Sequence, residues 1–241
     1  MADLLSGGGP GGRWNVVAAL TTEESLPEQP LFASARVPVV SSPIRAFYRR
    51  RGRPISDLSV REEYDEDVAR LLSGFHPDLL LFSSYLYFAT SALLSSRGGR
   101  VINIHGSDLY RRGPDGRPLY VGLRAVRDAI LAGEPETRAT AHWVTEELDA
   151  GTPILRSRPF PVSPLVPAAL ARHDIASVKA YAFAHQEWML NEAWGPMWRA
   201  VLRLVISGQT VSRGSEPAAR PAARNERAVS SQDPALAGVG R

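Results

Sequence analysis

An amide and an imidazole stand one residue apart in the stretch GRVINIHGSDL, residues 99–109. The apolar pair Val101-Ile102 predicts a buried strand, and Asn103 and His105 follow it directly. Because residues i and i+2 of a strand point the same way, both polar side chains are expected to face one place. Such convergence at the carboxyl end of a strand is typical of ligand sites in open parallel sheets. Two satisfied polar residues at a strand–loop junction would give the same pattern, so these residues alone leave both interpretations open.

The composition narrows the classes of function. The 241 residues include no cysteine, which excludes a disulfide framework, a thiolate nucleophile and a thiolate metal site. The five histidines show no metal-ligand spacing, so no metal cofactor is expected. No apolar run is long enough to cross a bilayer, and the first residues do not resemble a signal peptide. We therefore expect a cytoplasmic protein with no membrane partner.

The distribution of charge argues against a nucleic-acid partner. The net charge is +3, and residues 211–241 supply +2 of it through five arginines and three acids. One local basic patch precedes an acidic run at 62–67, and it consists of Arg45, Arg49, Arg50, Arg51 and Arg53. We interpret this patch as a solvated loop beside a solvated helix, with a phosphate contact as the alternative.

The elements that must position Asn103 and His105 alternate between strands and helices. Apolar runs predict strands at 14–20, 37–40, 78–84 and 101–105, and the third has the composition of a central parallel strand. Apolar residues at helical spacing predict a helix that begins at Asp57 or Ser59 and is closed by Gly74, and a short helix spans 90–96. This alternation indicates an α/β fold.

The second half of the chain continues with mixed elements. A polar loop precedes a helix whose inner stripe is predicted to be Leu119, Leu123, Val126 and Ile130. Strands at 139–144 and 153–158 flank a tight acidic turn. A helix begins near Asp174, and Pro196 is expected to kink or break it. Residues 211–241 are predicted to be a disordered tail, so the expected domains are one α/β domain over 1–210 and that tail.

Three segments together resemble the 10-formyltetrahydrofolate-dependent formyltransferases. Residues 77–105 contain a buried strand, a loop, a helix and the Asn-x-His strand end. Residues 133–155 contain His142-x-Val144 followed by Leu148-Asp149-x-Gly151. Residues 182–201 resemble the closing helix of the glycinamide ribonucleotide enzymes of this family. The resemblance is specific because these motifs follow one another at the right distances.

The resemblance implies a Rossmann-like open, mostly parallel sheet with helices on both faces, the formyltransferase fold. It implies a catalytic trio of Asn103, His105 and Asp149, with His142 near the folate. It also implies two segments that bind the folate, which are Leu86, Tyr87, Phe88 and Ala89 on one side and Thr145, Glu146, Glu147 and Leu148 on the other. The co-substrate would be 10-formyltetrahydrofolate, and the protein is expected to be a monomer or a homodimer.

The reaction implied is formyl transfer to a small amine, with glycinamide ribonucleotide of purine biosynthesis as the first acceptor to consider. When an amine attacks the formyl carbon, negative charge builds on the formyl oxygen. The Asn103 amide and a protonated His105 are suitable donors to that oxygen. Asp149 is expected to raise the pKa of His105, which keeps the imidazole charged, and to relay a proton from the amine toward the leaving nitrogen. No covalent nucleophile is needed.

Two departures from the family pattern concern the acceptor. Gly106-Ser107-Asp108-Leu109-Tyr110 replaces the family's proline-stiffened loop, and the 44 positions from His105 to Asp149 are a few more than the resemblance implies. Residues 6–12, SGGGPGG, follow the helical residues ADLL and lack the family's Gly-Ser-Asn phosphate turn. The first strand and the phosphate loop are therefore expected to be absent, and a ribonucleotide acceptor is expected to bind poorly.

Two other functions remain open on the sequence alone. The same trio could pass the formyl group to water, as in formyltetrahydrofolate hydrolases. Alternatively, the chain could be a non-catalytic remnant that binds folate or a partner, which the altered acceptor loop would explain.

Overall fold

The computed structural model describes residues 2–5, 7, 13–26, 29–96 and 98–208. The expectations for residues 6 and 8–12 and for the tail at 211–241 fall outside these ranges. The first half of the described chain contains the predicted elements together with two helices, α2 and α3, that were not predicted. Its order is α1 (Ala2–Leu5), β1 (Ala19–Thr21), α2 (Gln29–Ser34), β2 (Val39–Ser41), α3 (Ile44–Arg50), α4 (Leu58–Ser73), β3 (Leu80–Phe82), α5 (Ser91–Ser95) and β4 (Val101–His105). The second half contains α6 (Ala125–Leu131), β5 (Glu136–Thr137), β6 (Thr140–Trp143), β7 (Pro153–Arg156), β8 (Phe160–Pro161), α7 (Leu165–Ala171) and α8 (Ile175–Ile206). The α/β class is confirmed.

The main sheet has the strand order β3-β4-β6-β7, and separate pairs are formed by β1 with β2 and by β5 with β8. The strands up to β4 pair in parallel, whereas β6 runs antiparallel to β4 and β7 antiparallel to β6. The main sheet is therefore mixed, with one parallel and two antiparallel pairings. Alternating strands and helices could not show this, because a connection that contains a helix can return to either end of a strand. Residues 106–139 bring the chain back to the carboxyl end of β4, where His105 pairs with Thr140.

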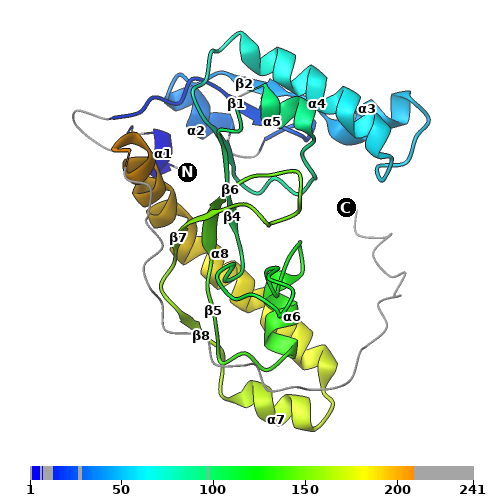
Figure 1. Ribbon diagram of the computed structural model, residues 1–241, viewed down its shortest axis with the longest axis vertical. Helices are drawn as coiled ribbons and strands as arrows, with labels where there is room; N and C mark the ends of the chain where they lie inside the picture. Colours follow the sequence, from blue (N-terminus) through cyan, green and yellow to red (C-terminus); the bar gives the residue numbers. More distant parts are fainter. Residues whose placement is uncertain (1, 6, 8–12, 27–28, 97, 209–241) are drawn as a thin grey trace.

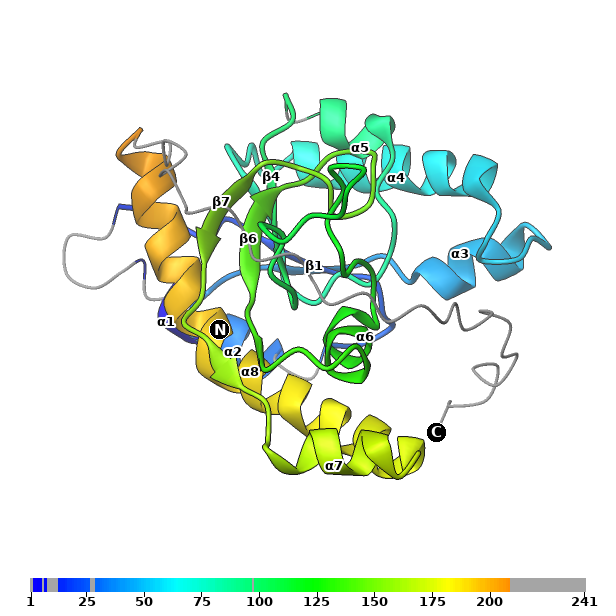
Figure 2. The same ribbon diagram turned by 60° about the horizontal axis from the view of Figure 1, so that its bottom comes forward.

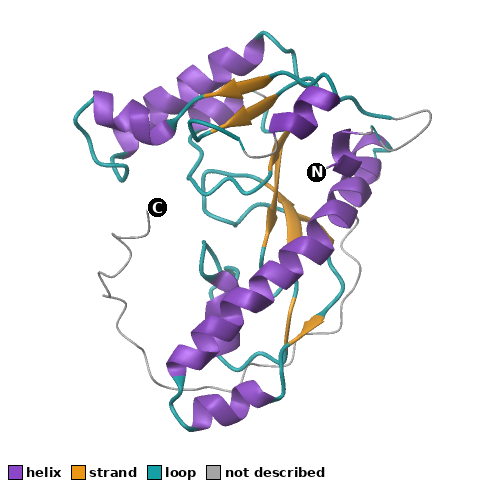
Figure 3. Cartoon of the chain, turned by 180° about the vertical axis from the view of Figure 1, so that it is seen from behind, coloured by secondary structure: helices purple, strands orange, loops and turns teal. Residues whose placement is uncertain are grey.

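Helices cover both faces of this sheet (Figures 1 and 2). The long helix α8 crosses one face, which is seen best from behind (Figure 3), and there it packs on Ile102 and Ile104 of β4. Helices α3, α4 and α5 form a second apolar cluster, which includes Val101. Residues of β4 thus alternate between two cores, as a strand buried on both faces requires. Asn103 and His105 share the side of Val101.

Helix α4 shows how local sequence sets an element that supports the site. The Asp57 side chain caps it by accepting from the Ser59 N–H at 3.1 Å, as the sequence predicts. Of the apolar residues predicted to form its inner stripe, Val60, Tyr64, Val68 and Leu72 are buried, whereas Leu71 is exposed. The Asp65 carboxylate on the same helix accepts from the Thr90 N–H at 2.6 Å, which ties α4 to the start of α5.

Several sequence expectations differ from the structure. The strand predicted at 14–20 is confined to Ala19–Thr21, because the Trp14 indole N–H donates to the Leu4 carbonyl and its ring packs with the α8 cluster. Strand β3 is an edge of the main sheet as far as the structure describes it, and its residues are half-buried, so the expected central position is wrong. Leu119 and Leu123 precede α6 and are exposed.

Helix α8 continues through Pro196 without a break. A proline inside a helix loses one backbone hydrogen bond. The buried residues of α8 on both sides of this position, among them Met189, Ala193 and Trp198, offset that loss by packing in one core. No described helix is both long and apolar enough to span a membrane.

Candidate active site

Four polar side chains meet at the carboxyl end of β4, and we call them the β4 cluster: Asn103, His105, His142 and Asp149. Strand pairing sets the first contact, because Asn103 lies directly opposite His142 in the antiparallel register of β4 and β6. The Asn103 Nδ2 atom is 3.4 Å from His142 Nε2. The Nδ1–H of His142 donates to the Trp143 carbonyl at 3.0 Å, which leaves Nε2 as the acceptor. An amide nitrogen carries two N–H donors, so one donor of Asn103 is left for a substrate.

Asp149 reaches the cluster from the turn between β6 and β7. Its Oδ2 is 3.4 Å from His105 Nε2, and its Oδ1 is 3.8 Å from His142 Nε2. The Gly122 backbone N–H donates to the same Oδ2 at 2.7 Å. The structure therefore brings together the predicted trio and adds His142 to it. The side chains of Asp149, His105 and His142 are only 6%, 11% and 2% exposed, so water screens their mutual interactions weakly.

The Asp-x-Gly motif needs its glycine for a steric reason. A Cβ atom on Gly151 would lie 1.6 Å from the Trp143 carbonyl oxygen, so the turn closes against β6 only if residue 151 has no side chain. Asp149 itself has φ +52°, the left-handed region that aspartate tolerates better than most residues. The backbone of this turn thus aims the carboxylate at the end of β4.

Burial decides the charge of the two imidazoles. It lowers the pKa of His105, although Asp149 and a hydrogen bond to the Tyr120 carbonyl act in the opposite direction. Burial also lowers the pKa of His142 to about 4, against the effect of Asp149. The expectation that Asp149 keeps His105 charged is therefore wrong for the free protein. Desolvation of the ring lowers its pKa more than the nearby carboxylate raises it. Both imidazoles are therefore neutral near pH 7.

The buried Nε2 of His105 has no hydrogen-bond partner within the described residues. Since the ring donates to the Tyr120 carbonyl, Nε2 is its proton-accepting atom, and it faces Asp149. A buried polar atom without a partner is costly unless a ligand pairs with it. The Asp149 Oδ2 atom lies 3.4 Å from this nitrogen, so a proton taken up by Nε2 would be stabilised by the carboxylate.

The two segments implied to bind folate combine exposed apolar side chains with anchored ones. Leu86, Phe88 and Leu148 are substantially exposed, whereas Ala89 is buried and Tyr87 is half-buried in the second core together with Val144. The turn beside Asp149 is held by the Thr145 hydroxyl, which donates to the Glu147 carbonyl at 3.1 Å. Glu146 and Glu147 are exposed, and Glu147 pairs with Arg117 at 3.3 Å. An apolar, flat ligand would cover the exposed carbon atoms.

Sequence reasoning missed the backbone groups that hold the cluster. The Tyr120 carbonyl accepts from His105, and the Gly122 N–H donates to Asp149. Neither residue type carries a catalytic signal, because their contribution comes from main-chain atoms placed by a loop. Among the described residues, no group of three or more His, Asp or Glu side chains is arranged to hold a metal ion.

With this fold and site in view, comparison with known proteins defines the class. Residues 17–164 match the family model described as formyl transferase, so the chain belongs to the formyl transferase family. This match begins well before the resembling segments and ends before α8. The resemblance inferred from the sequence is thereby confirmed.

Among curated proteins, the chain is similar to enzymes with two different reactions. It is 33% identical over 103 residues to phosphoribosylglycinamide formyltransferase of Escherichia coli (strain K12), covering 43% of this chain and 45% of that protein. It is 29% identical over 96 residues to formyltetrahydrofolate deformylase of the same strain, covering 40% and 31%. The chain thus spans less than half the length of these relatives.

Solved structures support the fold. Glycinamide ribonucleotide transformylase 1 from Symbiobacterium toebii aligns with a TM-score of 0.56 at 20% identity, covering 80% of this chain and 75% of that one. Phosphoribosylglycinamide formyltransferase from Streptococcus pneumoniae TIGR4 aligns with a TM-score of 0.54 at 18% identity, covering 78% and 86%. At this level of identity the likeness establishes the shared architecture, and the reaction has to be argued from the site.

Proposed function

We propose that this protein transfers a formyl group from 10-formyltetrahydrofolate to a small amine, with glycinamide ribonucleotide as the first acceptor to test. The observation that carries the proposal is the convergence of Asn103, His105 and Asp149 at the carboxyl end of β4, where His105 Nε2 lies 3.4 Å from the Asp149 carboxylate. Membership of the formyl transferase family supports the reaction class. The cytoplasm as its location and a monomer or homodimer as its assembly remain predictions.

In the proposed mechanism, the acceptor nitrogen attacks the formyl carbon and forms a new C–N bond. The free N–H of Asn103 donates to the formyl oxygen as it becomes negative. His105 begins neutral and can take the proton that the attacking nitrogen releases, and the resulting imidazolium lies 3.4 Å from the Asp149 carboxylate. The bond to the folate nitrogen then breaks, and that nitrogen receives the proton. No covalent intermediate with the protein is required.

The donor would lie against the two segments beside the cluster. We propose that the exposed Leu86, Phe88 and Leu148 side chains pack on the ring system, and that the backbone of 86–89 and 145–148 binds its polar edge. His142 would act by holding Asn103, since its Nε2 accepts from the amide.

The test is an assay of the full chain with 10-formyltetrahydrofolate, monitored by the loss of the formyl donor. We expect loss of the donor to depend on an added amine acceptor and to stop in Asn103→Ala. Calorimetric titration with a folate analogue tests binding separately. Absence of folate binding by a folded chain would contradict the proposal.

A second candidate is hydrolysis of the donor, which the similarity to formyltetrahydrofolate deformylase favours. Water would then replace the amine and formate would be released, with the same residues in the same roles. The assay separates the two reactions, because hydrolysis would consume the donor at the same rate with and without an acceptor.

A further inference from the structure

One carboxylate outside the β4 cluster contacts both ends of the loop that supports it. Glu134 follows α6, and its side chain is 11% exposed. Its Oε1 accepts from the Tyr120 hydroxyl at 2.9 Å, and its Oε2 pairs with Arg111. Between these two partners, residues 111–119 form a hairpin in which the Leu119 N–H donates to the Arg111 carbonyl at 3.0 Å. Glu134 thus closes the base of this hairpin.

The backbone just after the hairpin is the part that contacts the cluster. The Tyr120 carbonyl accepts from His105 and also from the Ser107 hydroxyl, the latter at 2.6 Å. Two residues later, the Gly122 N–H donates to Asp149 at 2.7 Å. A shift of residues 120–122 would therefore move the partners of both His105 and Asp149 at once.

Glu134 is itself fixed by the end of α6. Its N–H donates to the Ala129 carbonyl at 3.1 Å and the Gly133 N–H to the Ile130 carbonyl at 3.0 Å, while Gly133 has φ +84°. This pattern is a Schellman motif, which needs the left-handed glycine. Burial and the Glu134 carboxylate raise the pKa of the Tyr120 hydroxyl, so this hydroxyl stays protonated and donates. The contact from α6 to Tyr120 is therefore a hydrogen bond between two anchored groups.

We propose that Glu134 is a positioning residue for the reaction, which acts through Tyr120 and Arg111 to hold residues 120–122 against His105 and Asp149. This inference rests on the proposed function for its kinetic consequence, although its structural consequence can be measured without turnover. Glu134 contacts no reacting atom. Its role is to keep the His105–Asp149 geometry in a loop that would otherwise be free to move.

The first test uses the titration of the His105 ring, followed by NMR in the full chain and assigned with His105→Gln. In Glu134→Ala the loosened loop should admit water to the ring, so His105 should titrate nearer its ordinary pKa than in the wild type. The groups that face this ring are Asp149, His142 and the Tyr120 carbonyl, and all are retained in the variant. An unchanged His105 titration would overturn the proposal, whether or not the protein has formyltransferase activity.

The second test uses turnover. Glu134→Ala and Tyr120→Phe should each lower kcat by about tenfold or more, with the KM for the donor changed by less than about twofold, because the reacting groups are misplaced while the folate segments are intact. The double variant should be no worse than Glu134→Ala alone, because that variant has already lost the bond to Tyr120. The matched control is Glu136→Ala, which removes an exposed acid nearby that pairs with Arg138 at 2.9 Å and should leave kcat unchanged.

The two tests separate the possible failures. A loss of melting temperature alone, with His105 titration and kcat as in the wild type, would show that Glu134 only stabilises the fold. An effect of Tyr120→Phe that adds fully to the effect of Glu134→Ala would also contradict action through the shared bond. If the wild type transfers no formyl group, the proposed function fails, and the His105 titration still decides the role of Glu134.

Discussion

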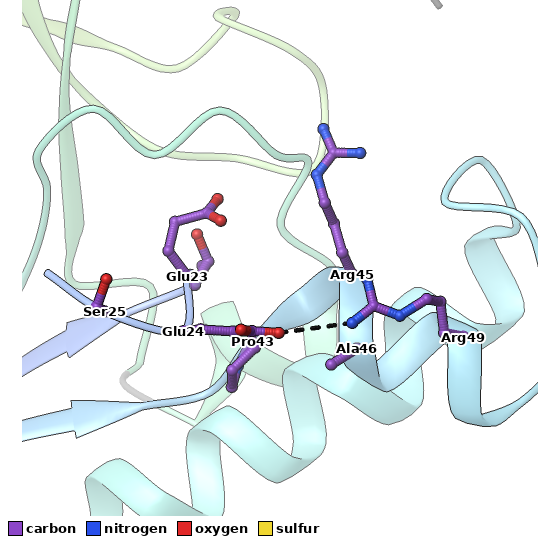
Figure 4. Close-up of a pocket in the computed structure, with 8 residues that line it drawn as sticks. Glu23, Glu24, Ser25, Pro43, Arg45, Ala46 and Arg49 are labelled. Atoms are coloured by element: carbon purple, nitrogen blue, oxygen red, sulfur yellow. Dashed lines mark ion pairs between the residues drawn. The ribbon is translucent and has the colours of Figure 1, made fainter. Parts of the chain in front are cut away.

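Two groups of charged side chains in this protein differ in how much water surrounds them. In the β4 cluster, His142 and Asp149 are buried and Asn103 and His105 are partly buried, and each side chain lies within 3.8 Å of at least one other. A surface pocket between β1 and α3, the β1–α3 pocket, is lined by Thr22, Glu23, Glu24, Ser25, Pro43, Arg45, Ala46 and Arg49 (Figure 4). Its one ion pair, Arg49 with Glu24 at 3.5 Å, joins side chains that are 68% and 78% exposed.

The comparison shows that burial, and not only residue type, sets the charge state of acids and bases. In the β4 cluster, burial lowers the pKa of both imidazoles, although a carboxylate lies within 3.8 Å of each ring. In the β1–α3 pocket, water solvates each charge and screens the pair. The neighbouring arginines are also neutralised from outside the pocket, since Arg51 pairs with Glu63 at 2.7 Å and Arg53 pairs with Asp57. The expected loop is wrong, because Arg45, Arg49 and Arg50 lie in helix α3, but the side chains of the patch are solvated as predicted.

The largest expected effect on stability comes from a substitution in the turn that carries Asp149. Gly151→Ala places a Cβ atom on the Trp143 carbonyl, so we expect it to cost at least about 4 kcal/mol of unfolding free energy or to prevent folding. Denaturant unfolding measures this. The control is Gly74→Ala, which meets open space at ordinary φ and should change stability by less than about 1 kcal/mol. Equal effects of the two variants would mean that the turn is not constrained as described.

The second largest expected effect is on turnover, and it tests the proposed role of the β4 cluster. Asn103→Ala and Asp149→Asn should each lower turnover by at least about a hundredfold, because each removes a donor to the oxyanion or the charge that supports it. Both variants should remain folded by circular dichroism. Glu23→Gln in the β1–α3 pocket is the control and should keep near-normal turnover. Normal turnover in both cluster variants would exclude the proposed mechanism.

The buried imidazoles also predict a dependence of stability on pH. The pKa of His142 is about 4 in the folded protein against about 6.5 when unfolded, so between these values the unfolded state binds more protons. Stability should fall as the pH drops from 6.5 toward 4, by about 2 kcal/mol at pH 5 from this group. Burial also lowers the pKa of His105, so protonation of this residue should likewise reduce stability as the pH falls.

Urea midpoints at pH 7.5 and pH 5 measure this loss. His142→Gln removes the titrating group, so the difference between the two pH values should shrink in this variant. If the wild type and His142→Gln lose the same stability, the buried histidine is not its source, and the contrast with the solvated pocket would be weaker than described.

The smallest effect is expected in the β1–α3 pocket. Removing its ion pair with Glu24→Gln should change the unfolding free energy by less than about 1 kcal/mol, because exposed pairs are offset by side-chain entropy and screened by salt. Thermal unfolding at low and high salt measures this. A large loss of unfolding free energy that does not depend on salt would show that this ion pair is structurally important. The pocket would then not differ from the β4 cluster in the way proposed.

Much of this protein was determined by its sequence without further information. The alternation of apolar runs with helical stripes predicted the α/β class and the strand that ends at Asn103 and His105. This was possible because a strand buried on both faces needs a continuous apolar run, and a helix buried on one face needs apolar residues at helical spacing. The family resemblance of His142-x-Val144 and Leu148-Asp149-x-Gly151 implied that Asp149 joins the site, and the steric demand at Gly151 explains why the turn needs a glycine there.

Tertiary structure alone decided what the cluster is chemically. The sequence suggested a charged His105, but burial among distant segments lowers its pKa more than Asp149 raises it. The mixed strand order, the direct pairing of Asn103 with His142, and the backbone groups of Tyr120 and Gly122 also come from segments far apart in the chain. Desolvation and main-chain contacts depend on what surrounds a residue in space. These surroundings cannot be predicted from residue type and spacing alone.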